Sequence, residues 1–212
     1  MQLVIGNKNY SSWSLRPWLV MTHFDIAFDE HLISLFSADM QEKMQGYCPN
    51  NKVPALIDEQ LTVWDSLAIC EYINEQYLHH DAWPANPQLR ATARSVCAEM
   101  HSGFFSVREE MPMNCRRQPN TIELSNNAKQ EIERIKAIWQ SCLAQHQGQF
   151  LFDKFSIADA FFMPIVVRFS IYQINVSKEI QSYMNTMLSL PAYQQWLADA
   201  MLEQQIITES ER

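Results

Sequence analysis

Residues 50–71 decide the fold, and they read Asn-Asn-Lys-Val-Pro-Ala-Leu-Ile-Asp-Glu-Gln-Leu-Thr-Val-Trp-Asp-Ser-Leu-Ala-Ile-Cys-Glu. Two short apolar runs, 55–57 and 61–64, are separated by three polar residues, which predicts a β-hairpin. After Ser66 the apolar positions change to helical spacing, at Leu67, Cys70, Ile73 and Tyr77. Ser66 is a favourable N-cap, so a helix starting there directs free N–H groups and a positive dipole end beyond the strands. A carboxylate is expected to fit that place.

The Val53–Pro54 dipeptide precedes the hairpin. Because Pro54 has no N–H, it is expected at the start of a strand, where a cis bond after Val53 is compatible with the pattern. The N–H and C=O of Val53 would then face outward and pair with an extended peptide-like ligand. Asp65 would contact an ammonium group and Ser66 a carboxylate, the combination that an α-amino acid end requires. The spacing leaves open a plain hairpin followed by a well-capped helix.

The composition is typical of a globular protein with a packed core: of 212 residues, 47% are hydrophobic and 11% aromatic. A net charge of −8 argues against nucleic acid or an anionic membrane as the main partner. The most apolar window, 161–167, is too short to span a bilayer, and the N-terminus lacks a signal-peptide pattern. Five scattered cysteines without Cys-x-x-Cys predict neither a disulfide framework nor a metal site. We therefore expect a soluble, cytoplasmic, metal-free protein.

The sequence pattern of residues 1–80 predicts a thioredoxin-like α/β domain, whose strands and helices follow in the order β-α-β-α-β-β-α. Pro17 sets the start of the first helix at about residue 13 or 14, because proline is tolerated in a first turn. The loop before this helix carries Ser11-Ser12-Trp13-Ser14 instead of Cys-x-x-Cys, so disulfide exchange is excluded there. The other expected elements are strands at 2–6 and 28–35, a helix at 40–47, the hairpin, and the helix after Ser66.

Residues 88–212 are expected to form an all-helical domain after a linker at 81–87, which contains two prolines and no periodicity. Ser156-Ile157-Ala158-Asp159 has the form of a capping box. It opens a nearly all-apolar helix, 160–169, which must be central to this domain. The other expected helices cover 89–110, 122–146, 179–187 and 192–201, followed by a frayed tail from residue 203.

Several separate parts of this pattern resemble the glutathione S-transferase family over nearly the whole chain. They are the Val-Pro pair at 53–54, the hairpin, the acidic-Ser pair at 65–66 and the capping box at 156–159. The resemblance implies the glutathione transferase fold, in which a thioredoxin-like domain is followed by an all-α domain. It also implies glutathione as co-substrate and a two-fold homodimer.

The resemblance assigns roles around glutathione to four residues, and Lys52 is a further candidate because it precedes the Val-Pro pair. The backbone of Val53 beside Pro54 would pair with the cysteinyl unit, and Asp65 and Ser66 would hold the γ-glutamyl end. Lys52 would meet the glycine carboxylate, with a solvated lysine at a strand edge as the alternative.

The loop before the first helix carries the candidates for activating the glutathione thiol. A thiol with a pKa of about 8.5 is only a few per cent thiolate at neutral pH. A hydroxyl that donates to sulfur at a helix N-terminus favours the thiolate. Residues 11–16, Ser-Ser-x-Ser-x-Arg, are similar to the start of zeta-class enzymes, in which the first serine of the pair activates the thiol. Ser11 is therefore the first candidate and Ser12 the second; Tyr10 is a rival, and helix capping by both serines is the alternative role.

The resemblance implies a transferase whose glutathione thiolate attacks a small hydrophobic electrophile. Trp13 departs from the zeta pattern, which has a cysteine there, and this weakens the alternative of a maleylacetoacetate-type isomerase. A non-catalytic binding protein of the same fold is the other alternative. No Gly-x-Ser-x-Gly is present, which argues against a serine hydrolase. Contacts with the second substrate, or equally packing in the core, are expected of His101, Phe104, Phe105, Arg108 and residues 111–114.

Overall fold

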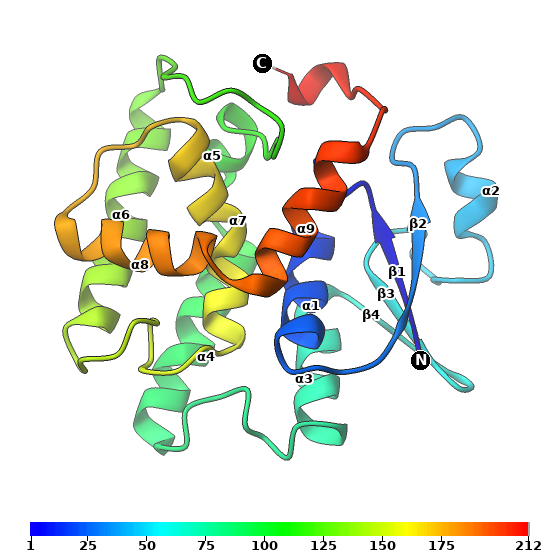
Figure 1. Cartoon of the computed structure of the whole chain (residues 1–212), viewed down its shortest axis with the longest axis horizontal. Helices are drawn as coiled ribbons and strands as arrows, with labels where there is room; N and C mark the ends of the chain where they lie inside the picture. Colours follow the sequence, from blue (N-terminus) through cyan, green and yellow to red (C-terminus); the bar gives the residue numbers. More distant parts are fainter. Residues whose placement is uncertain (212) are drawn as a thin grey trace.

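The computed structural model describes residues 1–211, and Figure 1 shows a small sheet beside a larger group of helices. The first elements are β1 (Gln2–Gly6), α1 (Ser12–His23), β2 (Asp29–Ile33), α2 (Met40–Met44), β3 (Ala55–Asp58), β4 (Leu61–Trp64) and α3 (Ser66–Gln76). The later ones are α4 (Pro87–Ser102), α5 (Phe105–Glu110), α6 (Asn126–Leu143), α7 (Ile157–Ile171), α8 (Lys178–Leu188), α9 (Pro191–Leu202) and the 3₁₀ turn η1 (Thr208–Ser210).

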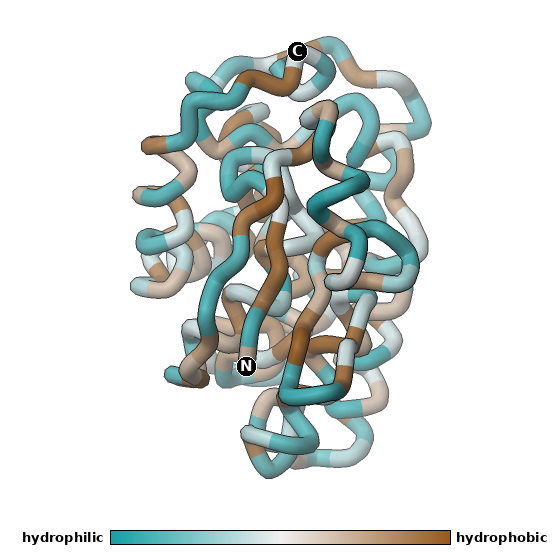
Figure 2. Tube along the Cα trace, turned by 90° about the vertical axis from the view of Figure 1, so that its right-hand side faces the viewer, coloured by the Kyte–Doolittle hydropathy of each residue, from teal (hydrophilic) through white to brown (hydrophobic). Residues whose placement is uncertain are grey.

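The sheet has the strand order β2-β1-β3-β4. β1 pairs parallel with β2 and antiparallel with β3, and β3 and β4 form the hairpin. Successive residues of a strand face opposite sides: Leu3 and Ile5 pack into the large core with α1, whereas Val4 packs with Met44 of α2. Figure 2 shows mainly hydrophobic residues along the inner strands and hydrophilic residues at the connecting turns, whereas the edge strand β2 begins with the polar residues Asp29, Glu30 and His31. This arrangement confirms the predicted thioredoxin-like topology.

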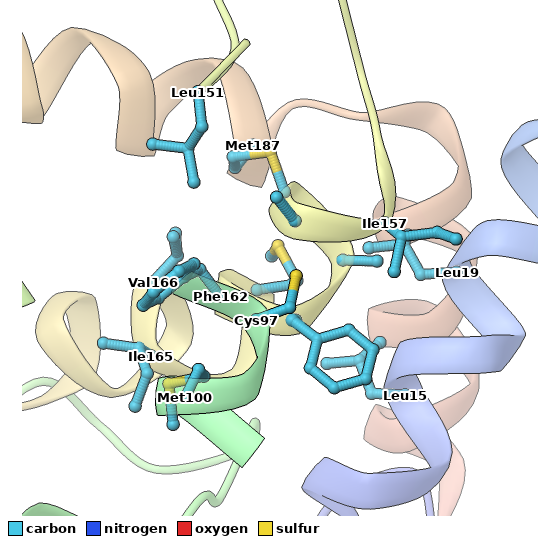
Figure 3. Close-up of a cluster of buried hydrophobic side chains, with 14 of the residues drawn as sticks. Leu15, Leu19, Cys97, Met100, Leu151, Ile157, Phe162, Ile165, Val166 and Met187 are labelled. Carbon is cyan, nitrogen blue, oxygen red and sulfur yellow. The ribbon is translucent and has the colours of Figure 1, made fainter. Parts of the chain in front are cut away.

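α7 is the centre of the helical region, and 14 of its 15 residues are buried. Figure 3 shows its apolar side chains packed between those of other helices: Leu15 and Leu19 of α1, Cys97 and Met100 of α4, and Met187 of α8. The predicted capping box is present, because the Ser156 N–H and hydroxyl both donate to Asp159 Oδ2 over 2.9 Å. Burial raises the pKa of Asp159 to about 6.

Two helix starts differ from the sequence prediction. The N-cap of α3 is Asp65 and not Ser66, since Asp65 Oδ1 accepts from the N–H groups of Leu67 (2.8 Å) and Ala68 (3.4 Å). α1 begins at Ser12, earlier than expected, so Pro17 lies inside the helix beyond its first turn. In both helices the cap is the side chain of the residue directly before the first helical residue. The sequence prediction therefore placed the two helix starts one or two residues too late.

The predicted helix 89–110 was wrong, because the chain breaks into α4 and α5 at Gly103 and Phe104. Phe104 has a left-handed backbone (φ 60°), and an added Cβ at Gly103 would lie 2.9 Å from the carbonyl oxygen of Glu99. Arg108 holds the break, since its Nε donates to the Gly103 carbonyl over 2.9 Å and its Nη2 donates to the carbonyl of Met100. The guanidinium thus replaces hydrogen bonds that a continuous helix would make.

The second long helix and the C-terminal tail also differ from expectation. α6 begins at Asn126, four residues late, because the Ser125 hydroxyl caps it by accepting from Ala128 N–H. The tail expected to be frayed is docked instead. The Glu203 carboxylate accepts from the N–H groups of Lys8 (2.6 Å) and Asn9 (3.0 Å), and Ile207 is buried.

Candidate active site

Two adjoining cavities lie where the loop before α1 meets the hairpin and the helical region. The hairpin cavity, of about 300 Å³, is lined by Trp13, Asn50, Lys52, Val53, Pro54, Asp65 and Ser66. The loop cavity, of about 360 Å³, is lined by Tyr10, Ser11, Ser12, Trp13, Leu35, Phe36, Met40, Lys52, Val53, Arg108, Pro112, Met113, Arg168, Ile207 and Ser210. Both cavities are lined by Trp13, Lys52 and Val53, so they adjoin along these three residues.

The backbone of Val53 is available to a ligand in the hairpin cavity. The Val53–Pro54 bond is cis, and β3 begins only at Ala55, which pairs with Val4. Within residues 1–211, neither the N–H nor the C=O of Val53 makes a hydrogen bond. An exposed donor and acceptor on one residue are suited to an extended peptide, which pairs with such a residue as an added strand would.

Asp65 and Ser66 stand together at the start of α3. Asp65 uses Oδ1 to cap the helix, and its Oδ2 lies 3.1 Å from Nε2 of His101 on α4. Ser66 is 1% exposed, and its buried hydroxyl has no hydrogen-bond partner in the described part of the chain. A buried polar group without a partner is unfavourable. A carboxylate at this helix N-terminus would satisfy the Ser66 hydroxyl and interact with the helix dipole.

His101 connects the helical region to the hairpin cavity. Burial lowers the pKa of His101, Asp65 opposes this shift, and the charges of Arg16 and Arg108 add to it. The imidazole is therefore neutral at pH 7, with its Nε2–H donating to Asp65. A neutral imidazole leaves the Asp65 carboxylate without a cationic partner in His101, so that an ammonium group of a ligand can take this place.

The hydroxyls of the loop before α1 differ in their hydrogen bonds. Ser11 Oγ donates to Ser14 Oγ over 2.8 Å and accepts from Ser14 N–H over 3.4 Å, while Ser14 Oγ also accepts from Gly6 N–H over 3.0 Å. Because hydroxyl protons rotate, this bond can reverse when a ligand accepts the Ser11 proton: Ser14 then donates to Ser11, and the Ser11 oxygen has two donors. Ser12, also at the cavity, makes no hydrogen bond through its hydroxyl within the described residues.

Tyr10 is directed to the C-terminal tail. Its hydroxyl donates to the Glu211 carboxylate and accepts from Arg116 Nη2 (3.0 Å) and from the Ile207 N–H (3.3 Å). With these partners, the Tyr10 hydroxyl has no proton left for a sulfur in the cavity.

The loop cavity combines an apolar wall with two arginines. Arg168, on α7, donates through Nε to the Met111 carbonyl over 2.6 Å. Burial lowers the pKa of Arg168 to about 9 and that of Arg108 to about 10, so both are charged at neutral pH. This surface suits an organic molecule that carries a negative charge. Its apolar wall consists of Leu35, Phe36, Met40, Pro112, Met113 and Ile207.

The structure brings all seven predicted site residues to these two cavities; their chemical roles stay predictions. Lys52, Val53, Pro54, Asp65 and Ser66 line the hairpin cavity, and Ser11 and Ser12 line the loop cavity. Among the residues expected to contact a second substrate, only Arg108, Pro112 and Met113 do line the loop cavity. Phe104 is buried in the core and Phe105 is 69% exposed.

Sequence reasoning missed several residues of the cavity walls. Arg168 had a signal, namely a single arginine in an otherwise apolar helix, which is costly unless it has a use. Ile207 and Ser210 had none, because they reach the cavity only through the docked tail. No helix within residues 1–211 has the length and hydrophobicity needed to cross a membrane, and no three potential metal ligands cluster there.

Comparisons with known proteins agree with this architecture. The family model described as the glutathione S-transferase N-terminal domain matches residues 10–76. A probable maleylacetoacetate isomerase of Caenorhabditis elegans is 23% identical over 189 residues, covering 88% of this chain and 87% of the relative. A stringent starvation protein A homolog of Histophilus somni is 22% identical over 181 residues, covering 84% of this chain and 81% of the relative.

A solved structure extends the likeness to the whole fold. The crystal structure of a glutathione transferase homolog from Burkholderia, with bound glutathione, superposes with a TM-score of 0.75 at 22% identity, covering 94% of this chain and 97% of that one. The N-terminal domain model and the fold of the whole chain lead to the same conclusion. Residues 10–76 match the glutathione S-transferase N-terminal domain, and the whole chain has the fold of solved glutathione transferases.

Proposed function

We propose that the hairpin cavity binds glutathione and that the protein is a glutathione transferase of the serine type. The observation that supports this most is the meeting of the free Val53 backbone with the Asp65–Ser66 pair in one cavity. Val53 pairs with the cysteinyl unit beside Pro54, Asp65 receives the ammonium group, and the unsatisfied Ser66 hydroxyl receives the γ-glutamyl carboxylate. Lys52, which lines both cavities, would meet the glycine carboxylate.

Ser11 is the proposed activator of the glutathione thiol, and Ser12 is the alternative. A decrease of about two units in the thiol pKa needs roughly 2.7 kcal/mol of preferential stabilisation of the thiolate. One charge-assisted hydrogen bond at a helix N-terminus supplies energy of that order. Ser11 is favoured because Ser14 can fill its acceptor positions and leave its proton for sulfur.

The test is turnover of a model aryl halide by single serine variants. Ser11→Ala is expected to lower kcat at least tenfold while the glutathione dissociation constant changes less than threefold. Ser12→Ala is the matched control, since it removes a hydroxyl of the same loop and keeps the cap of α1. Unchanged turnover in Ser11→Ala would reject the role of Ser11, and a loss confined to Ser12→Ala would transfer that role to Ser12.

The second substrate is proposed to be a small apolar electrophile with an anionic group. The apolar wall of the loop cavity accounts for the hydrophobic part, and Arg108 and Arg168 account for the charge. An acidic electrophile is therefore expected to have a higher kcat/KM than its methyl ester. The Arg168→Met variant is expected to reduce that preference.

A second candidate is glutathione-dependent isomerisation of a small dicarboxylic ketone of the maleylacetoacetate type. The two arginines in the loop cavity favour it, and so do relatives named maleylacetoacetate isomerase from the worm and the rat. Trp13 at the position of the zeta-class cysteine argues against it. Direct assay of the isomerase substrate separates the two: conversion without a conjugate indicates isomerisation, and a stable conjugate indicates transfer.

We also propose a cytoplasmic homodimer. The five cysteines are free thiols in the structure, as is usual for proteins of a reducing compartment. Large side chains exposed on the hairpin side, such as Leu61 and Trp64, are available for an interface. Light scattering is expected to give twice the chain mass of 24.8 kDa, and a particle of single-chain mass would reject the dimer.

A further inference from the structure

Arg16 is a buried arginine without a hydrogen-bond partner. It lies on α1 with 0% of its surface exposed, and within residues 1–211 no acceptor contacts its Nε, Nη1 or Nη2. The group packs against aromatic rings, with its central carbon 4.2 Å from the ring centroid of Trp13 and 4.7 Å from that of Phe161. Ring contacts stabilise a cation but do not accept its N–H groups in the way an anion does.

The two other arginines near it are already hydrogen-bonded. Arg108 donates to the Gly103 carbonyl and Arg168 to the carbonyls of Met111 and Pro164. Both also lie close enough to Arg16 that their charges, after burial itself, lower its pKa. A carboxylate brought to this place would remove the repulsion and occupy the free donors of Arg16.

Trp13 separates Arg16 from both cavities. Trp13 lines the hairpin cavity and the loop cavity and is 36% exposed, whereas Arg16 lines neither of them. The indole also contacts the Arg108 guanidinium, 4.8 Å from the ring centroid, and the His101 ring, 5.3 Å away between centroids in a T-shaped arrangement. The Trp13 ring is thus the wall between a free guanidinium and the substrate space.

The Trp13 side chain is held by ring contacts and not by a hydrogen bond within residues 1–211. The indole N–H of Trp13 donates to no acceptor in the described part of the chain. Three other tryptophans are fixed by hydrogen bonds, in which Trp18 donates to Glu30, Trp83 to Glu71 and Trp196 to the Lys8 carbonyl. Rotation of the Trp13 side chain therefore breaks no hydrogen bond.

We propose that Arg16 is the anchor of a carboxylate subsite at the junction of the two cavities and that the Trp13 ring is its movable cover. A carboxylate of the second substrate displaces the indole and accepts two parallel hydrogen bonds from the guanidinium. Trp13 thereby sets specificity, because only ligands that displace it reach Arg16. The inference rests on the proposed function, since it names the chemistry of the second substrate.

The test measures binding of benzoate by calorimetry, without glutathione and without turnover. Wild-type protein is expected to bind benzoate and not neutral benzamide. Trp13→Ala is expected to bind benzoate at least tenfold more tightly, a change of about 1.4 kcal/mol. Trp13→Phe keeps a ring over Arg16 and is the matched control, with an affinity close to that of wild type. In the double variant Trp13→Ala/Arg16→Met the gain is expected to disappear.

Three results would overturn the proposal: no gain in Trp13→Ala, an equal gain for benzamide, or a gain that persists after Arg16→Met. Arg16→Met removes a buried charge that has no hydrogen-bond partner and is costly to bury, and circular dichroism checks that the variant is folded. If the Arg16 double variant does not fold, Trp13→Ala/Arg108→Gln is measured in its place. The gain in benzoate affinity is expected to remain in that variant. Its loss would show that the carboxylate binds Arg108 and not Arg16. Failure to bind glutathione would reject the proposed function and leave this binding result unaffected.

Discussion

The chemistry proposed here depends on one hydroxyl having a free proton. Ser11 accepts from the Ser14 N–H and lies 2.8 Å from the Ser14 hydroxyl, which itself accepts from the Gly6 N–H. This chain of groups runs from β1 through α1 to the cavity. It makes Ser14 a positioning residue, because it orients the Ser11 proton without reaching the cavity wall itself.

The Ser14→Ala variant tests this chain of groups. Without the Ser14 hydroxyl, Ser11 loses a donor and its proton is no longer directed to sulfur. We expect kcat to fall about three- to tenfold, less than in Ser11→Ala, and the kinetic pKa of bound glutathione to rise by about half a unit, which equals about 0.7 kcal/mol. Ser14→Thr keeps the hydroxyl and is expected to restore most of kcat; a pH profile identical to wild type in Ser14→Ala would contradict the role.

Because His101 lies beside Asp65, we expect the affinity for glutathione to depend on pH. The pKa of His101 is lowered by burial, so this residue is neutral at pH 7 and becomes cationic as the pH falls. The cation lies 3.1 Å from Asp65 and then competes with the ammonium group of glutathione. The dissociation constant is expected to rise as the pH falls from 7 to 5, by calorimetry, whereas His101→Gln keeps a donor and shows a flat profile. A wild-type profile as flat as that of the variant would reject the competition.

At this scale the sequence predicted the local motifs well. Val53–Pro54 and Asp65–Ser66 lie within 14 residues, so one hairpin and one helix start bring them together. His101 and Arg168 could not be assigned in this way. Their partners, Asp65 and the Met111 carbonyl, are distant in the sequence and meet them only through packing.

Among the elements, the break between α4 and α5 and the docked tail shape the loop cavity. The break turns the chain so that Arg108 and Met113 face the cavity, and the tail adds Ile207. Periodicity did not predict the break, because residues 89–110 keep an apolar stripe across it. Nor did it predict the docking of the tail, which depends on Glu203 meeting the N–H groups of a loop 194 or more residues away.

A smaller side chain at Ile207 is expected to let the loop cavity accept larger substrates. Ile207 is 4% exposed and closes one side of the loop cavity. Ile207→Ala is expected to raise kcat/KM for a bulky electrophile relative to a small one at least threefold, with unchanged glutathione affinity. Ile206→Ala changes the exposed neighbour and serves as control. An unchanged ratio for the two electrophiles would remove the tail from the substrate wall.

The cap of α7 predicts a pH dependence of stability. Burial raises the pKa of Asp159 from 3.8 to about 6, so the folded state binds its proton more tightly than the unfolded chain. The contribution of Asp159 to the free energy of unfolding is fully present below pH 3.8 and is lost as the pH rises through about 6. The shift of about two units corresponds to roughly 3 kcal/mol.

Denaturant unfolding of wild type and Asp159→Asn measures this effect. The difference in unfolding free energy, wild type minus variant, is expected to decrease between pH 4 and pH 7. Asp153→Asn, at an exposed position in the preceding loop, is the control and is expected to show no such trend. A constant difference for Asp159→Asn would contradict the shifted pKa.

Helices of the sheet region pack against helices of the helical region and join these two parts of the molecule. α1, beside the sheet, packs against α7 through Leu15 and Leu19, as Figure 3 shows, so the two cavities lie over a continuous core. The sequence predicted the order of elements and the central buried helix, because both follow from local periodicity. The junction itself could not be predicted, since no spacing in the chain reports which helix meets which. The domain boundary at 81–87 stays a prediction.

Ligand binding is expected to stabilise the whole chain. Glutathione at one hundred times its dissociation constant would add about 2.7 kcal/mol to the free energy of unfolding, because it binds the folded state alone. Thermal melting is expected to show a higher Tm with glutathione for wild type and a smaller rise for Ser66→Ala, with Ser34→Ala, outside both cavities, as control. Equal shifts in wild type and Ser66→Ala would remove Ser66 from the site.

A crystal structure of the protein soaked with glutathione tests the central claim most directly. We predict the tripeptide in the hairpin cavity, with its cysteinyl backbone paired to Val53, its γ-glutamyl carboxylate on Ser66, and its sulfur within about 3.5 Å of the Ser11 hydroxyl. Glutathione bound elsewhere, or a sulfur out of reach of both Ser11 and Ser12, would contradict the account.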